Sequence, residues 1–246
     1  MTRADLLEQI RSLRVRGLTP VQIAREVGLS KAEIAPLLRQ VAGRPAAGPA
    51  GGAESALAER DLVGCWVSSG WSFGLGLDDA TDLAAAVPFA EGESQGTSGL
   101  VAVLIARAGD RPMVLTVCGY LVDVYCLGLK TTVGPWSVRR GALDERSRGF
   151  FAGFPAGAVP APLALAQHLV HGGVAYAAGL GFEPDPDFAT TSAHLGPAPD
   201  GPCPITFGRD GMPFYVSGPY DDAGAVVATL EAGVGPGNYH YLVGID

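Results

Sequence analysis

The stretch LVAVLIARAGDRPMVLTVCGYLVDVYCLG, residues 100–128, indicates how the larger part of this chain folds. Its two ends, LVAVLIA (100–106) and MVLTVCGYLVDVYCLG (113–128), are rich in β-branched and other apolar residues, as strands are. The ARAGDRP segment between them contains Gly and Pro, which favour a turn. The stretch therefore predicts an antiparallel hairpin.

The pattern outside this hairpin predicts further strands and helices. They are a second hairpin formed by ITF (205–207) and PFYVS (213–217), a helix over 162–181, a shorter helix over 221–232 and a last strand over 238–245. Asp210 and Gly211 suit a hairpin turn that requires positive φ, and Pro162 suits the first turn of a helix. Antiparallel hairpins with one or two packed helices indicate an α+β domain.

A segment dense in Gly, Pro and Ala divides the chain. GRPAAGPAGGAESA (43–56) has no sustained apolar pattern, which is typical of a flexible linker. The predicted organisation is an all-α domain of three helices over 1–42, a linker over 43–60 and the α+β domain over 61–246.

The two domains differ in charge. Residues 1–44 carry eight Lys and Arg against four acidic residues, a net charge of +4, whereas the remainder carries nine against 21, a net charge of −12. A phosphate backbone would attract the first part and repel the second. The asymmetry indicates nucleic-acid contact through the N-terminal domain.

The segment TPVQIAREVGLSKAEIAPLLRQ, residues 19–40, resembles the helix-turn-helix of bacterial regulators and recombinases. Ala24 is small where the two helices would meet, and Gly28 suits the left-handed turn between them. Ser or Thr followed three residues later by Glu or Gln starts both helices, as in a capping box. The residues predicted to form a shared apolar seam are Ile23, Val27, Leu29, Ile34 and Leu37, with Leu6, Leu7, Ile10 and Leu13 on a supporting helix.

The resemblance implies an interface with double-stranded DNA on this segment. The groove-facing candidates are Ser30, Lys31, Ala32 and Ala35, and the phosphate-contacting candidates are Gln22, Arg25, Arg39 and Arg44. Pro36 should kink the second helix, at a cost of about 3 kcal/mol in an ordinary helix interior. Because two groove positions are Ala, we expect modest sequence specificity, and useful affinity then requires a homodimer or a second anchor.

The larger domain contains a pattern of possible metal ligands. His168 and His171 are three residues apart on one predicted helix, and Asp185 and Asp187 follow. Two imidazoles and a carboxylate could ligate zinc or another divalent ion. The alternative is that the histidines lie at the helix edge and the aspartates stabilise a turn.

Asp123 and Lys130 are candidates for acid–base chemistry. If Val122 and Val124 face the core, Asp123 points outward and needs no special role. A buried Asp123 would instead need a partner such as Lys130 and could then exchange protons. His240, in a Gly- and Tyr-rich segment near the C-terminal end, is a third candidate.

Composition favours a cytoplasmic protein without a membrane segment. The chain is 48% hydrophobic and 17% charged, and no apolar run approaches the roughly 20 residues that span a bilayer. The opening residues lack the apolar segment of a secretion signal. The four cysteines have no CxxC spacing, which fits buried, reduced thiols.

Most of residues 62–244 resemble a bacterial domain family without an assigned function. The resemblance is carried by VDVYCLGLK, by HLVHGGVAYAAGLGFEPDPDF and by DGMPFYVSGPYDD with the GNYHYL ending. The resemblance implies a compact domain and no particular activity. The sequence thus predicts a DNA-binding transcriptional regulator whose α+β domain senses or dimerises, with a small-molecule effector or a protein as further partner and no cofactor. Two alternatives stay open: a metal-dependent hydrolase or nuclease targeted by the helices, and a protein–protein adaptor.

Overall fold

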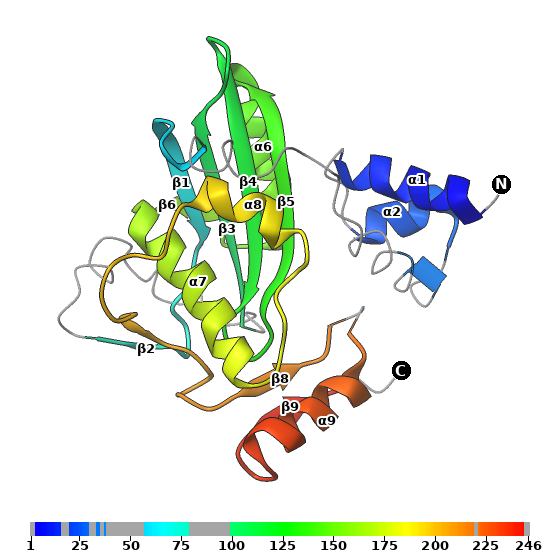
Figure 1. The fold of residues 1–246 in the computed structure, drawn as a ribbon, viewed down its shortest axis with the longest axis vertical. Coiled ribbons are helices and arrows are strands. Elements are labelled where there is room, and N and C mark those ends of the chain that lie inside the picture. The colour runs from blue at the N-terminus through cyan, green and yellow to red at the C-terminus, as the bar shows by residue number, and fades with distance from the viewer. Residues whose placement is uncertain are drawn as a thin grey trace.

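An antiparallel sheet of five strands is the centre of the computed structural model, which describes residues 3–15, 20–29, 33, 34, 37, 57–78, 99–218 and 221–243. The strand order is β5-β4-β3-β1-β6, and every neighbouring pair is antiparallel (Figure 1). The strands are β1 (Leu62–Ser68), β3 (Leu100–Ala108), β4 (Val114–Asp123), β5 (Gly128–Arg139) and β6 (Ala158–Pro160). An α+β fold is therefore confirmed.

The predicted hairpin over residues 100–128 is confirmed in its first part and wrong in its second. β3 and β4 pair from Leu100 opposite Asp123 to Ala108 opposite Leu115. The apolar run does not continue as one strand, however, because the chain turns after Asp123 and returns as β5 from Gly128. A carboxylate oxygen of Asp123 accepts the backbone N–H groups of Tyr125 and Cys126, which stabilises this β4–β5 turn.

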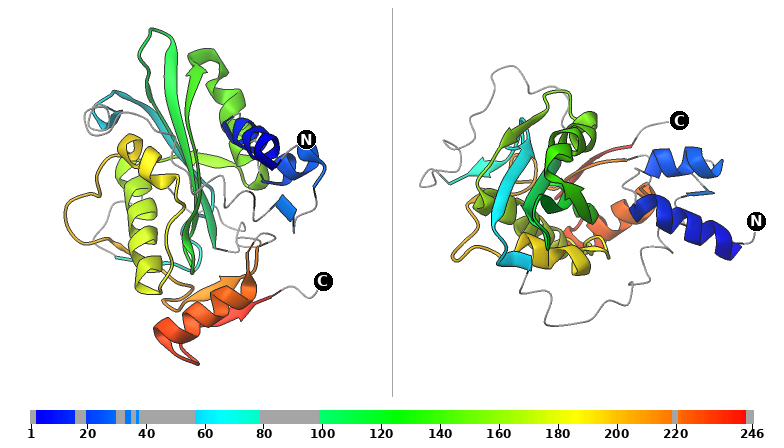
Figure 2. Two further views of the ribbon diagram at one scale, coloured as in Figure 1. Left: turned by 45° about the vertical axis from the view of Figure 1, so that its right-hand side comes forward. Right: turned by 90° about the horizontal axis from the view of Figure 1, so that it is seen from above.

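Helices cover both faces of the sheet. The helical segments are α6 (Leu143–Phe150) with the flanking 3₁₀ turns η1 (Arg140–Ala142) and η2 (Phe151–Gly153), α7 (Leu163–Gly179) and α8 (Phe188–Leu195). α7 and α8 lie on one face and α6 on the other (Figures 1 and 2). Successive side chains of β3 point to opposite faces of the sheet and enter both cores. Val103 and Ile105 pack beneath α7, whereas Leu104 packs with Trp136 and Phe151.

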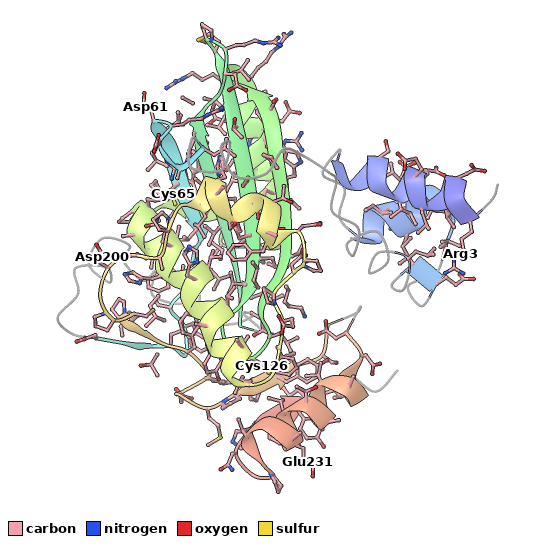
Figure 3. The ribbon with its side chains drawn as sticks, viewed as in Figure 1. Arg3, Asp61, Cys65, Cys126, Asp200 and Glu231 are labelled. Atoms are coloured by element: carbon pink, nitrogen blue, oxygen red, sulfur yellow. The ribbon has the colours of Figure 1, made fainter. Side chains whose placement is uncertain are left out.

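A smaller unit packs against the end of the sheet where the β4–β5 turn lies. It contains β8 (Phe214–Val216), α9 (Ala223–Val234) and β9 (His240–Leu242), and β8 and β9 pair in parallel. Its apolar core joins Tyr215 and Leu230 to Cys126 of the turn and Leu180 after α7. Figure 3 shows Cys126 at this junction.

The predicted second hairpin, over residues 205–217, is wrong. β7 (Ile205–Thr206) pairs with β2 (Gly76–Leu77), and β8 pairs with β9. The predicted turn itself forms, since Asp210 and Gly211 have φ of 53° and 79° within a single bridge between Arg209 and Met212. The flanking residues do not extend this bridge, because their backbones bond to the β4–β5 turn: Gly208 N–H donates to Val124 and Phe214 N–H to Tyr125.

The predicted helices over 162–181 and 221–232 are confirmed as α7 and α9. Pro162 directly precedes α7, and Asp222 caps α9 by accepting the N–H of Ala225. The last predicted strand is confirmed over the three residues of β9. Of the cysteines, Cys65, Cys118 and Cys126 are buried free thiols as predicted, whereas Cys203 is exposed.

The N-terminal segment contains α1 (Arg3–Val15) and α2 (Pro20–Val27), followed by a turn at Gly28. Their apolar residues form a cluster separate from the cores of the sheet. Its buried members are Ile10, Leu13, Ile23, Ala24, Ile34 and Leu37, with Leu6, Leu7, Val27 and Leu29 at its edge. Every residue of the predicted seam therefore packs in one cluster.

Within the described ranges, no helix combines the length and the apolar character that crossing a bilayer requires.

Candidate functional site

The turn after α2 is defined by a left-handed glycine and a backbone hydrogen bond. Gly28 has φ +70°, and the N–H of Leu29 donates to the carbonyl of Ala24 at 2.9 Å. This six-to-one bond past a left-handed residue is the Schellman motif, in which an apolar contact of the following residue is common. Leu29 makes that contact within the N-terminal cluster. Beyond the turn, Ile34 and Leu37 pack in the same cluster.

Most of the predicted DNA-contacting residues lie outside the described part of the chain. They are Ser30, Lys31, Ala32, Ala35, Arg39 and Arg44, and Pro36 lies outside it as well. Gln22 is within α2, and Arg25 is exposed in the last turn of α2. A cation at this end of a helix also complements the helix dipole.

Asp123 is buried, with 2% of its surface exposed, so of the two alternatives the one in which it points outward is wrong. Burial raises the pKa of its carboxyl to about 6, against the opposing effects of Lys130 and of backbone N–H donors in the β4–β5 turn. A raised carboxyl pKa of this kind occurs at catalytic sites, and it also occurs where a carboxylate closes a buried turn. The hydrogen bonds of Asp123 assign it at least the second role.

Lys130 forms its ion pair with Asp221 rather than with Asp123. The Nζ atom of Lys130 lies 2.9 and 2.8 Å from the two carboxylate oxygens of Asp221, and both side chains are largely buried. Asp221 also accepts the N–H of Gly218 at 2.8 Å and the hydroxyl of Tyr215 at 3.4 Å. The pair therefore ties β5 to the segment that precedes α9.

Asp123→Asn is expected to change how stability depends on pH. The folded pKa of Asp123, about 6, exceeds its ordinary value of 3.8, so Asp123 contributes stability that is complete below pH 3.8 and lost as pH rises through 6. The shift corresponds to about 3 kcal/mol. Urea unfolding of both proteins from pH 4 to pH 7 should therefore show the wild type losing about that amount relative to D123N. A difference that is the same at every pH would contradict the assignment.

Two of the four candidate metal ligands, His171 and Asp185, have local structural contacts. His171 lies 2.8 Å through its Nε2 from the carbonyl of Gly196, after α8. Asp185 accepts the N–H of Asp187 at 2.7 Å and that of Thr132 at 3.4 Å. Burial lowers the pKa of His168. Among the residues that the structure describes, no three His, Cys, Asp or Glu side chains gather as a metal site would require.

His240 lies on β9 and is exposed, with its ring 6.5 Å from that of Phe214. No described contact joins it to Asp123 or Lys130. The three candidate acid–base residues therefore divide between a buried turn, a buried ion pair and an exposed strand.

Two of the buried polar residues, Arg107 and His194, are ionisable side chains that the sequence did not predict to be buried. Arg107 is buried and donates to the carbonyls of His194, Leu195 and Arg60, so it caps the C-terminal end of α8. His194 is fully buried, and its Nε2 lies 3.0 Å from the carbonyl of Thr116. Burial lowers the pKa of His194 to about 4, aided by Arg107. An Arg in a β-branched run was the available signal for a buried cation.

Comparison of the chain with family models, curated protein sequences and solved structures finds no match.

Proposed function

We propose that the chain is a DNA-binding protein, a transcriptional regulator whose N-terminal helices contact the duplex and whose α+β domain senses a ligand or dimerises. The observation that carries the proposal is the packing of the N-terminal segment. A helix, a second helix and a glycine turn bring Ile10, Ile23 and Ile34 into one buried cluster. That arrangement supports a helix-turn-helix, in which the helix after the turn lies in the major groove.

The conformation of the turn supports this proposal further. Gly28 is exposed and has no atom within 4 Å of the place where a Cβ would lie, so backbone conformation alone explains the glycine. Ala24, which is buried, packs in the same cluster as Ile34 beyond the turn. The net charge of +4 on residues 1–44 supplies the attraction to phosphates.

The α+β domain offers a surface for dimerisation. Tyr241, Leu242 and Val243 expose 53%, 59% and 44% of their surfaces, and β9 pairs only with β8 among the described strands. A strand at the edge of a sheet with exposed apolar side chains readily pairs with another strand. Pairing with the same strand of a second copy would give the twofold symmetry common to dimers and would double the DNA contacts. A cytoplasmic location is part of the same proposal.

Single substitutions in the segment 30–44 test the DNA contact in the full chain. Lys31→Ala and Arg39→Ala should each weaken duplex affinity about fivefold and reduce the salt dependence by about one phosphate contact. Arg209→Ala, an exposed arginine on the β7–β8 connection, is the matched control and should leave affinity unchanged. A mobility-shift titration at physiological salt measures all four proteins.

Two results of that titration would remove the proposal. If both Lys31→Ala and Arg39→Ala bind the duplex with wild-type affinity, the segment after the Gly28 turn does not contact the duplex. An absence of any duplex binding by the wild type would favour the adaptor function, in which the helices bind a protein.

A further inference from the structure

The cations of the acidic domain are unevenly placed. Nine Lys and Arg follow residue 44, and seven of them lie in segments around the β3–β4 turn, at the end of the sheet opposite the β4–β5 turn. They are Arg60, Arg107, Arg111, Arg139, Arg140, Arg146 and Arg148. In Figure 3 several nitrogen-tipped side chains surround this upper end of the sheet.

Three of these arginines and a methionine form one exposed surface, which we call the arginine tip: Arg111, Met113, Arg139 and Arg140. The backbone joins them directly. Val114 pairs with Arg139 across β4 and β5, Arg140 N–H donates to the carbonyl of Met113 at 2.9 Å, and Val114 N–H donates to that of Arg111 at 3.1 Å. All four side chains are exposed.

The arginine tip has no ion-pair partner among the residues that the structure describes. The nearest acid in the turn, Asp110, forms an ion pair with Arg60. Elsewhere in this domain Lys130 and Arg209 are the only Lys and Arg, so these cations are concentrated at this end, where Asp144 and Glu145 also lie in the first turn of α6.

Met113 is placed unusually for a large apolar residue. It exposes 69% of its surface and has φ of 63°, in the left-handed region that side chains other than Gly rarely adopt. The preceding residue, Pro112, is also exposed. Apolar Met and Pro side chains beside arginines are the chemistry with which proteins contact the minor groove of DNA.

We propose that the arginine tip is a second DNA contact, with its arginines on phosphates and Met113 against the minor groove. The inference rests on the proposed function, because one helix-turn-helix unit with alanine at two of its predicted groove positions is expected to have little affinity by itself. The acidic domain then has one end that attracts DNA phosphates, whereas the rest of its surface repels them. The ligand of the arginine tip is double-stranded DNA, and no particular base sequence is required.

The test compares the full-length wild type with the triple variant R111A/R139A/R140A. Fluorescence anisotropy with a labelled 30-base-pair duplex of random sequence would be recorded between 50 and 200 mM salt. Loss of three phosphate contacts should lower the slope of log affinity against log salt by about 2 to 3 and affinity by roughly ten- to a hundredfold. Arg209→Ala should retain both the affinity and the slope of the wild type.

A second variant, Met113→Ala, separates apolar contact from charge. It should weaken binding severalfold with an unchanged salt slope. Because all four side chains are exposed, the melting temperatures of the variants should stay near that of the wild type, which excludes unfolding as the cause.

The outcomes distinguish this inference from the function on which it rests. If the wild type binds the duplex and R111A/R139A/R140A binds it with the same affinity and slope, the arginine tip is not a DNA contact although the proposed function stands. If the wild type binds no duplex, both fail. Binding of the wild type to phosphatidylserine vesicles in preference to duplex would assign the tip to a membrane surface and overturn the inference.

Discussion

Replacing Gly128 with Ala (G128A) is expected to lower the free energy of unfolding by about 4 kcal/mol, from left-handed strain and overpacking together. Gly128 begins β5 with φ +63°. A Cβ there would lie 2.6 Å from both the Cβ of Ala177 and the carbonyl oxygen of Gly173, two residues of α7. Since the β4–β5 turn and α7 approach so closely, neither can move away without opening the core. Urea denaturation measures the loss.

Gly157→Ala is the matched control for G128A. Gly157 has a similar φ of +72°, but no atom lies within 4 Å of the place where its Cβ would be. The free energy of unfolding of Gly157→Ala should therefore fall only by the cost of the left-handed backbone, about 1 kcal/mol. Equal losses in the two variants would show that close packing of α7 on the turn contributes nothing.

Asp221→Ala is expected to lower the free energy of unfolding by about 3 kcal/mol, because it leaves Lys130 largely buried without its partner. The same change removes the acceptor for Gly218 N–H. The β8–β9 unit should detach first, because Asp221 joins its loop to β5. Thermal unfolding would measure the loss of stability, and amide hydrogen exchange in α9 would detect the early detachment of the β8–β9 unit.

A double-mutant cycle of Lys130→Met and Asp221→Asn isolates the ion pair itself. Asn keeps an oxygen for the N–H of Gly218, so the coupling energy reports the interaction with Lys130. A coupling of about 1 to 2 kcal/mol is expected for a largely buried pair, and a value near zero would mean that the pair adds no stability.

The elements that the sequence predicts correctly are those whose partners are near in the chain. The β3–β4 hairpin closes over a short turn, and α7 carries its own helical pattern. The end of β4 was missed, because Asp123 looked like an outward residue within an apolar strand. It is instead the acceptor that closes the turn to β5. A single polar residue that bonds to its own following backbone is hard to distinguish from one that faces solvent.

The prediction of a second hairpin over residues 205–217 was wrong for a different reason. Its turn at Asp210 and Gly211 forms as the residues demand, but the neighbouring backbone is bonded by Val124 and Tyr125, over eighty residues earlier. The ion pair of Lys130 likewise has its partner at Asp221, which no local pattern indicates. The arginine tip was hidden by the net charge of −12, because an overall charge conceals where the cations gather.

The salt dependence of duplex binding by the full-length wild type tests the proposed function most directly. Anisotropy of a labelled random duplex should show binding at 50 mM salt that weakens at least a hundredfold by 200 mM, as expected when roughly four or more phosphates are contacted. No binding at 50 mM salt, or an affinity independent of salt, would contradict a cationic contact between this chain and DNA.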